Sequence, residues 1–353
     1  MIVTDNLAVN VFRLAERQQE NFTTEAFATL VRHLANRRPA VAVALVESVS
    51  GASLPRPDEA PWRVRTQEDL GDGRGIFDLR IQAGPGDVII EVKLGADAEF
   101  AQLSSYLRAI DGDAPSHRVV SLTGRVSGPV PEGVVVRLWH QVAGWLHAQL
   151  EAADLGEVDK HVVEQFLGLL YHLRLAAPVA RSPLSKGVNE HREKLGGDVV
   201  SPLFGRRTRA LHHLEPHAEL HPLRDLLLLV RQILETLPET KTLSVDSSAG
   251  NWTGFILNRL EFLIFVELHD PDRLVVDRWR EPGDVDAFDG RRGDERRGRV
   301  YESHGAWRWR TSIDLVEDGR GFFDLGATAQ RELLTGFLAE ALRYGRSLES
   351  PGG

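Results

Sequence analysis

The residues of this sequence best suited to chemistry are Asp78, Glu91 and Lys93, which lie in two short apolar segments, 76–81 and 88–94. Side chains alternate between the two faces of a β-strand, so Glu91 and Lys93 share one face if the second segment is a strand. Two carboxylates brought together in a partly buried place repel each other unless a hard cation neutralises them, and Mg²⁺ takes oxygen ligands of this kind. A neighbouring lysine can orient a water molecule or stabilise charge that develops on a phosphate. The combination suits phosphodiester hydrolysis.

A hairpin and two helices are expected to position these side chains. The turn sequence Gly84-Pro85-Gly86 predicts that the two segments pair, which would bring Asp78 toward Glu91. Residues 1–38 and 99–110 show the apolar spacing of helices. The other segments of the first half are predicted as strands at 41–49, 62–67, 118–122 and 134–138 and as helices at 142–150 and 160–175. This half is therefore expected to be α/β.

An acidic residue on one strand followed by acidic-X-Lys on the next resembles the signature of the PD-(D/E)XK nuclease superfamily. Asp78 matches the first part and Glu91-Val92-Lys93 the second, while Phe77 stands where the proline of the family's name would be. The resemblance covers about residues 20 to 140. It implies a restriction-endonuclease-like αβββαβ core, which agrees with the predicted order of elements.

The resemblance also implies roles for individual residues. Asp78 and Glu91 would hold Mg²⁺, for which Mn²⁺ can substitute, and the backbone carbonyl of Val92 would add a ligand. Lys93 would orient the attacking water and stabilise the pentavalent phosphate. An acidic residue on the first helix is also implied, and Glu25 is expected to contribute to metal binding and catalysis directly or through water. A simple alternative for Glu25 is a first-turn acid that is favoured by the helix dipole.

Many members of the family carry Gln-X-X-X-Tyr on the helix beyond the lysine, and Gln102 and Tyr106 fit this pattern. Their i, i+4 spacing puts them on one helical face, where they are expected to contact nucleic acid. Ordinary helix packing is the alternative for this pair. For the strand residues, the alternative is a surface pair of Glu91 with Lys93, with Asp78 capping a loop.

Two basic segments are candidates for binding phosphates. Residues 181–213 carry seven basic and three acidic side chains, including Arg206, Arg207 and Arg209, and prolines and glycines interrupt them. Residues 291–299 carry a second run of arginines. A surface loop in contact with solvent is the more common meaning of such a run, and a grip on the DNA backbone is the alternative.

Four histidines, His212, His213, His217 and His221, suggest a metal-binding face because three of them follow i, i+4, i+8 spacing. Pro216 interrupts the helix that this spacing requires. The sequence therefore argues against a metal site at these histidines.

Composition sets the frame for these motifs. The chain has 353 residues and no cysteine, which excludes disulfides, thiolate metal sites and a cysteine nucleophile. The length suggests two domains. We expect a nuclease core at residues 1–150, a helix and basic hinge at 151–222, and an α+β accessory domain at 223–353. The last part is predicted to contain helices at 223–237 and 327–344 and strands at 253–257, 262–268, 274–279, 299–302 and 307–315.

These patterns predict a Mg²⁺-dependent nuclease, with DNA favoured by family analogy and a defence or restriction role suggested. A catalytically weak nucleic-acid-binding or interaction module on the same core is the alternative, and an enzyme for another phosphate ester is a third. The net charge of −9 argues against non-specific coating of nucleic acid. No signal peptide or membrane-spanning segment is evident, so a cytoplasmic location without membrane contact is expected, with a homodimer or a partner protein left open.

Overall fold

The computed structural model divides the chain into two compact units, Met1–Ala176 (unit 1) and Ala177–Gly353 (unit 2). The structure describes residues 19–69, 76–95, 100–110, 117–125, 129–152, 155–194, 214, 217–238, 240, 243–249, 252–257, 262–267, 270–279, 299–303, 306–316 and 321–347. The boundary falls inside the segment 151–222, which the sequence predicts as a helix and a hinge. The predicted helix belongs to unit 1, and the rest of that segment belongs to unit 2.

Five strands form a mixed sheet in unit 1, in the order β1-β2-β3-β4-β5. Their bounds are β1 (Trp62–Asp69), β2 (Ile76–Ala83), β3 (Gly86–Val92), β4 (His117–Thr123) and β5 (Val134–Leu138). The first three strands pair antiparallel, whereas β4 and β5 run parallel to β3. A parallel pair needs a crossover, which contains helix α3 (Phe100–Ala109) between β3 and β4. The expected α/β class is confirmed.

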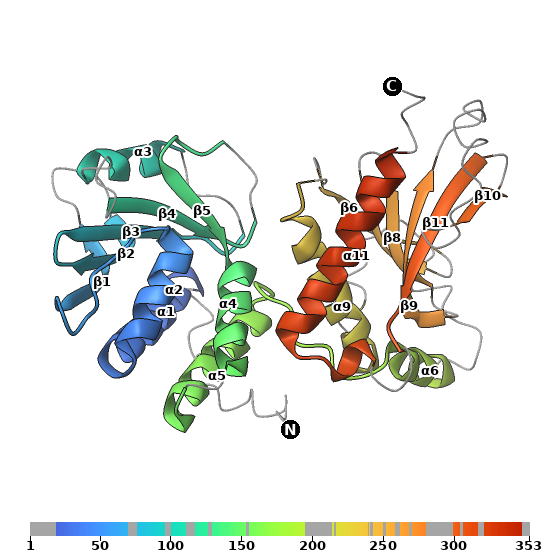
Figure 1. The fold of residues 1–353 in the computed structure, drawn as a ribbon, viewed down its shortest axis with the longest axis horizontal. Coiled ribbons are helices and arrows are strands. Elements are labelled where there is room, and N and C mark those ends of the chain that lie inside the picture. Colours follow the sequence, from blue (N-terminus) through green and yellow to red (C-terminus); the bar gives the residue numbers. More distant parts are fainter. Residues whose placement is uncertain are drawn as a thin grey trace. The chain divides into compact units, whose positions relative to one another are not determined.

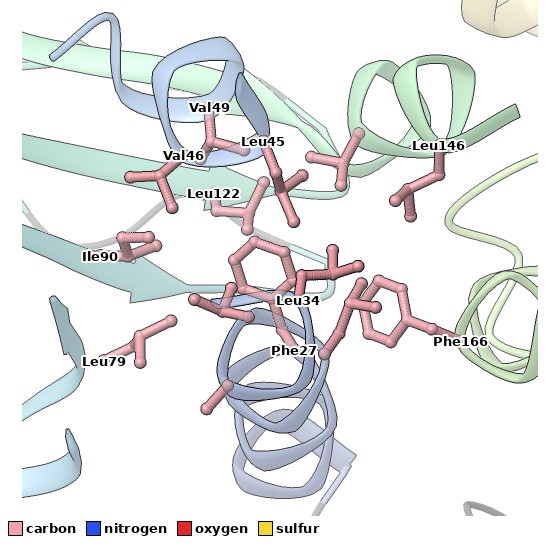
Figure 2. Packing of buried hydrophobic residues seen from close by; sticks show 14 of the residues in the cluster. Phe27, Leu34, Leu45, Val46, Val49, Leu79, Ile90, Leu122, Leu146 and Phe166 are labelled. Carbon is pink, nitrogen blue, oxygen red and sulfur yellow. The ribbon is translucent and has the colours of Figure 1, made fainter. Parts of the chain in front are cut away.

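Helices cover both faces of this sheet (Figure 1). One side holds α1 (Gln19–Arg37), α2 (Pro39–Ser50), α4 (Trp139–Glu151) and α5 (Glu157–His172), and α3 lies on the other. Figure 2 shows the larger core, in which apolar side chains of these helices meet those of the strands, among them Phe27, Leu34, Leu45, Val46, Leu79, Ile90 and Leu122. Because both faces are covered, the central strand β3 is buried along its whole length.

The predicted hairpin is confirmed. Ala83 pairs with Gly86 and Ile81 with Val88, so β2 and β3 form an antiparallel pair that is joined by a tight turn. Gly84 has a φ of 55°, a left-handed conformation that glycine adopts without steric cost.

The strand predicted at residues 41–49 is wrong, because these residues form helix α2. Pro39 stands in the first turn, where its fixed φ suits a helix start, and Gly51 ends the helix with a φ of 67°. The buried side chains of the helix follow the spacing of one helical face: Ala42, Leu45, Val46 and Val49. Two of the valines in this segment, Val46 and Val49, are buried in the core that α2 forms with the sheet.

Unit 2 contains an antiparallel sheet in the order β10-β11-β9-β8-β7-β6. Its strands are β6 (Leu243–Ala249), β7 (Trp252–Leu257), β8 (Phe262–Glu267), β9 (Asp270–Trp279), β10 (Arg299–Ser303) and β11 (Ala306–Asp314). Helices α9 (His221–Leu234) and α11 (Ala327–Ser347) pack on one face (Figure 1). Shorter elements are α6 (Leu184–Lys194), η3 (Ala218–Leu220) and η6 (Phe322–Asp324).

The expected α+β arrangement of the second half agrees with this description, although no strand was predicted at the position of β6. Helix α6 lies in residues 181–213, which the sequence predicts as a loop, so that part of the prediction is wrong.

A buried carboxylate fixes α1 to α5. Asp159 is 1% exposed, and its oxygens accept hydrogen bonds from Arg37 Nε and Arg38 Nε, both at 2.8 Å. His33 Nε2 lies 2.9 Å from the same carboxylate. Burial alone would raise the pKa of Asp159, but the hydrogen bonds from the two arginines and His33 outweigh it and hold the pKa below its usual range. The cluster therefore fixes the position of α1.

Asp159→Asn is expected to destabilise unit 1 by about 2 kcal/mol, because it leaves three donors with a neutral partner and the arginines are partly exposed. Urea unfolding at neutral pH measures this, with the exposed Glu157→Gln on the same helix as a control that changes little. Since the folded pKa lies below the unfolded value of 3.8, the contribution is present above that pH and is lost on further acidification. A difference that persists unchanged in acid would contradict this explanation.

Candidate functional site

The candidate site lies where β3 ends, and Glu91 is its most buried carboxylate. Glu91 is 1% exposed, although it carries a carboxylate. Lys93 follows directly after the strand, and its Nζ lies 3.0 Å from Glu91 Oε1. The predicted sharing of one face by these two side chains agrees with this contact.

Asp78 reaches the same place from β2. The pairing of β2 with β3 extends only to Leu79 and Ile90 at this end, and beyond it the Asp78 side chain takes over: its Oδ2 accepts the backbone N–H of Val92 at 2.8 Å. Its other oxygen, Oδ1, accepts a hydrogen bond from Gln67 Nε2 at 2.9 Å. Two donors thus orient the carboxylate of Asp78.

Gln67 on β1 was not anticipated as a site residue. Its φ is 51°, a left-handed conformation that is uncommon for a residue other than glycine. Such conformations cost free energy and cluster at functional sites. No local sequence signal identifies it, because the conformation arises at an irregular point of the β1–β2 pair.

Tyr106 lies against Glu91 from α3. Its hydroxyl is 3.0 Å from Glu91 Oε2 and 2.6 Å from the carbonyl oxygen of Ile76, and it accepts a hydrogen bond from Gln102 Nε2 at 2.7 Å. A phenol has one proton, so the carbonyl and the carboxylate compete for it. Tyr106 is fully buried, which contradicts its predicted contact with nucleic acid and makes it a residue that positions Glu91. Gln102, one turn before Tyr106 on α3, donates its hydrogen bond to the Tyr106 hydroxyl.

The helical acid of the site is Glu20, not the predicted Glu25. Glu20 Oε2 lies 3.3 Å from Lys93 Nζ, and Glu20 Oε1 accepts the backbone N–H of Leu94 at 3.4 Å. Glu25 instead accepts a hydrogen bond from the Thr66 hydroxyl and lies 3.5 Å from Arg32 Nη1. The prediction for Glu25 was wrong: α1 carries both acids, and Glu20, nearer the start of the described helix, is the one that contacts Lys93.

Charge is unevenly compensated at this site. Burial and, after it, the charge of Asp78 raise the pKa of Glu91, whereas Lys93 and Tyr106 lower it, and the net result is a pKa of about 7. Burial lowers the pKa of Lys93, but the carboxylates of Glu91, Glu20 and Asp78 outweigh it and the pKa is raised overall. Lys93 is therefore a cation at neutral pH, while Glu91 lies near its midpoint.

Backbone contacts fix Lys93 in place. Its N–H donates to the carbonyl of Leu122 at 2.9 Å, and its own carbonyl accepts from Gly124 N and Trp139 Nε1, both at 3.1 Å. A Cβ at Gly124 would lie 2.1 Å from the carbonyl oxygen of Leu94, so only glycine fits this close approach. The site is thus built on rigid elements.

The donor set suits a hard divalent cation. Asp78 and Glu91 offer carboxylate oxygens, and the backbone carbonyl of Val92 is adjacent in the chain, which are the ligand types that Mg²⁺ prefers. Ser121 of β4 lies opposite Glu91 of β3 in the sheet. The buried hydroxyl of Ser121 has no hydrogen-bond partner among the described residues. Both the raised pKa of Glu91 and this hydroxyl fit a site completed by a hydrated cation.

The predicted phosphate-binding arginines, Arg206, Arg207 and Arg209, lie outside the described residues, as does nearly all of the arginine run 291–299.

Comparisons with protein-family models, curated proteins and solved structures found no match to this chain. In the part of the chain that the structure describes, no helix is both long and apolar enough to cross a membrane.

Glu91 should give the metal-free protein a characteristic pH dependence. Its folded pKa of about 7 lies above its ordinary 4.5, so the folded state retains a proton that the unfolded state has lost. The free energy of unfolding should therefore fall as pH rises through this window, by about 3 kcal/mol for full ionisation. Glu91→Gln removes this titration, so the variant should be more stable than the wild type above neutral pH.

Urea unfolding in EDTA, across this pH window, measures the difference between the two proteins. Glu25→Gln, an acid of the same unit outside the site, should retain the wild-type slope. If the free energy of unfolding depends on pH in the same way for wild type and Glu91→Gln, the pKa of Glu91 is not raised in the folded protein.

Proposed function

We propose that this protein is a Mg²⁺-dependent nuclease that hydrolyses phosphodiester bonds of DNA. One observation carries the proposal: Asp78, the buried Glu91 and Lys93 converge at the end of one hairpin, with Lys93 Nζ 3.0 Å from Glu91 Oε1. The order of strands in unit 1, with α1 before them and α3 between β3 and β4, supports a restriction-endonuclease-like core.

Asp78 and Glu91, with the carbonyl of Val92, would hold Mg²⁺. When bound there, the cation would supply Lewis acidity toward the phosphate and lower the pKa of water. Asp78 is already oriented for this role by Gln67 and by the N–H of Val92. The Tyr106 hydroxyl contacts Glu91, and Gln102 in turn donates a hydrogen bond to that hydroxyl.

Lys93 would act as a hydrogen-bond donor and fixed positive charge. Its raised pKa keeps it protonated at neutral pH, so it is unsuited to serve as a general base. Its ammonium group would orient the attacking water and stabilise the negative charge that develops on the phosphate. Glu20 keeps Lys93 at the end of the strand through the 3.3 Å contact.

Incubation of the purified protein with supercoiled plasmid, linear duplex and single-stranded DNA tests the proposal, in Mg²⁺, Mn²⁺ or EDTA. Cleavage is expected with either metal and not in EDTA. Asp78→Asn and Lys93→Met should each lower the rate at least about 100-fold. Glu20→Gln should lower it about 10-fold, because Glu20 acts through Lys93.

Glu25→Gln is the matched control from the same helix and should cleave like the wild type. Equal cleavage by wild type and Asp78→Asn would point to a contaminating nuclease and contradict the proposal. Salt-dependent DNA binding with no cleavage under any condition would instead favour the binding module on the same core.

A further inference from the structure

A second group of side chains with metal-binding chemistry lies in unit 2. His191 of α6, His217 directly before η3 and Glu219 within η3 each place one ligand atom within 4.8 Å of the other two. The two imidazole rings meet edge to face, with centroids 4.7 Å apart. The sequence argument against a metal role for His217 tested only its spacing with the histidines nearby in the chain. Its partner in this group is His191, which lies on α6.

The hydrogen bonding of the two ring nitrogens of His191 indicates what kind of ligand this group would accept. His191 is 4% exposed, and its Nδ1 lies 2.8 Å from Glu219 Oε1. A carboxylate can only accept, so Nδ1 carries the proton and a neutral ring keeps its lone pair on Nε2. That Nε2 is buried without a hydrogen-bond partner among the described residues. Such an unsatisfied group costs free energy unless a ligand meets it.

We propose that this group binds a divalent d-block cation of the zinc type, with His191 Nε2 and a ring nitrogen of His217 as ligands. Imidazole nitrogens suit zinc and its neighbours rather than Mg²⁺. Glu219 is the carboxylate that accepts from the other ring nitrogen of His191, an arrangement that orients a histidine ligand and raises its basicity. The cation would join α6 to η3.

The backbone supports a preformed site. A Cβ at Gly187 would lie 2.0 Å from the carbonyl oxygen of Glu219, so α6 and η3 are in direct backbone contact. Helix α6 and η3 therefore hold the histidines at a fixed separation before any ion arrives, which favours binding because little order is lost.

Lys194 provides a discriminating variant. Its Nζ lies 3.1 Å from Glu219 Oε2, and its side chain is 62% exposed. The ammonium group repels a second cation and shares the carboxylate, so Lys194→Gln should tighten metal binding by several-fold. A group that serves only to pack the helix against η3 would give no such gain.

Zinc binding to the full-length protein tests the proposal, by competition with a chromophoric chelator in excess Mg²⁺, which keeps oxygen-ligand sites occupied. The wild type should bind one zinc ion per chain, and His217→Gln should lose at least about 10-fold in affinity. His221→Gln is the matched control, because it belongs to the helical spacing of the sequence but not to this group. It should bind like the wild type.

Circular dichroism verifies that each variant is folded, and zinc should raise the melting temperature of the wild type but not of His217→Gln. Three results would overturn the proposal: no competition by the wild type, equal binding by wild type and His217→Gln, or a loss in His221→Gln instead.

Discussion

The burial of a single carboxylate, that of Glu91, is the constraint on which the candidate site depends. Helices on both faces of the sheet bury β3 completely, so a charge on this strand is removed from water. Lys93 and Tyr106 compensate part of the cost, yet burial and the charge of Asp78 still raise the pKa of Glu91 to about 7. In the proposed function, a divalent cation would supply the positive charge that Lys93 alone does not provide for the carboxylates of Glu91 and Asp78.

The surrounding elements serve this arrangement in distinct ways. The hairpin brings Asp78 to Glu91, and Gln67 and the N–H of Val92 set the direction of its carboxylate. Helix α1 contributes Glu20, and the buried Asp159 anchors that helix at its other end. The approach of Gly124 to Leu94 leaves the backbone around Lys93 little freedom.

Local patterns made part of this structure predictable from the sequence. The turn at Gly84 and the two-residue period of a strand were sufficient to place Glu91 beside Lys93. Helix α2 was missed because a run of alanine and valine fits a strand or a buried helix, and packing decides between them. Glu20, Gln67 and the pairing of His191 with His217 depend on how elements distant in sequence dock, which spacing along the chain cannot show.

Proton release on metal binding tests the central claim most directly. Mn²⁺ is titrated into the full-length protein in a calorimeter, in buffers of different ionisation enthalpy, so that the heat of binding reports the protons released. The Glu91→Gln variant is titrated in the same way. If a cation completes the charge at Glu91, binding at neutral pH should release about half a proton per ion, with almost none at alkaline pH and none from the variant. Binding without proton release at neutral pH, or no binding at all, would contradict the account.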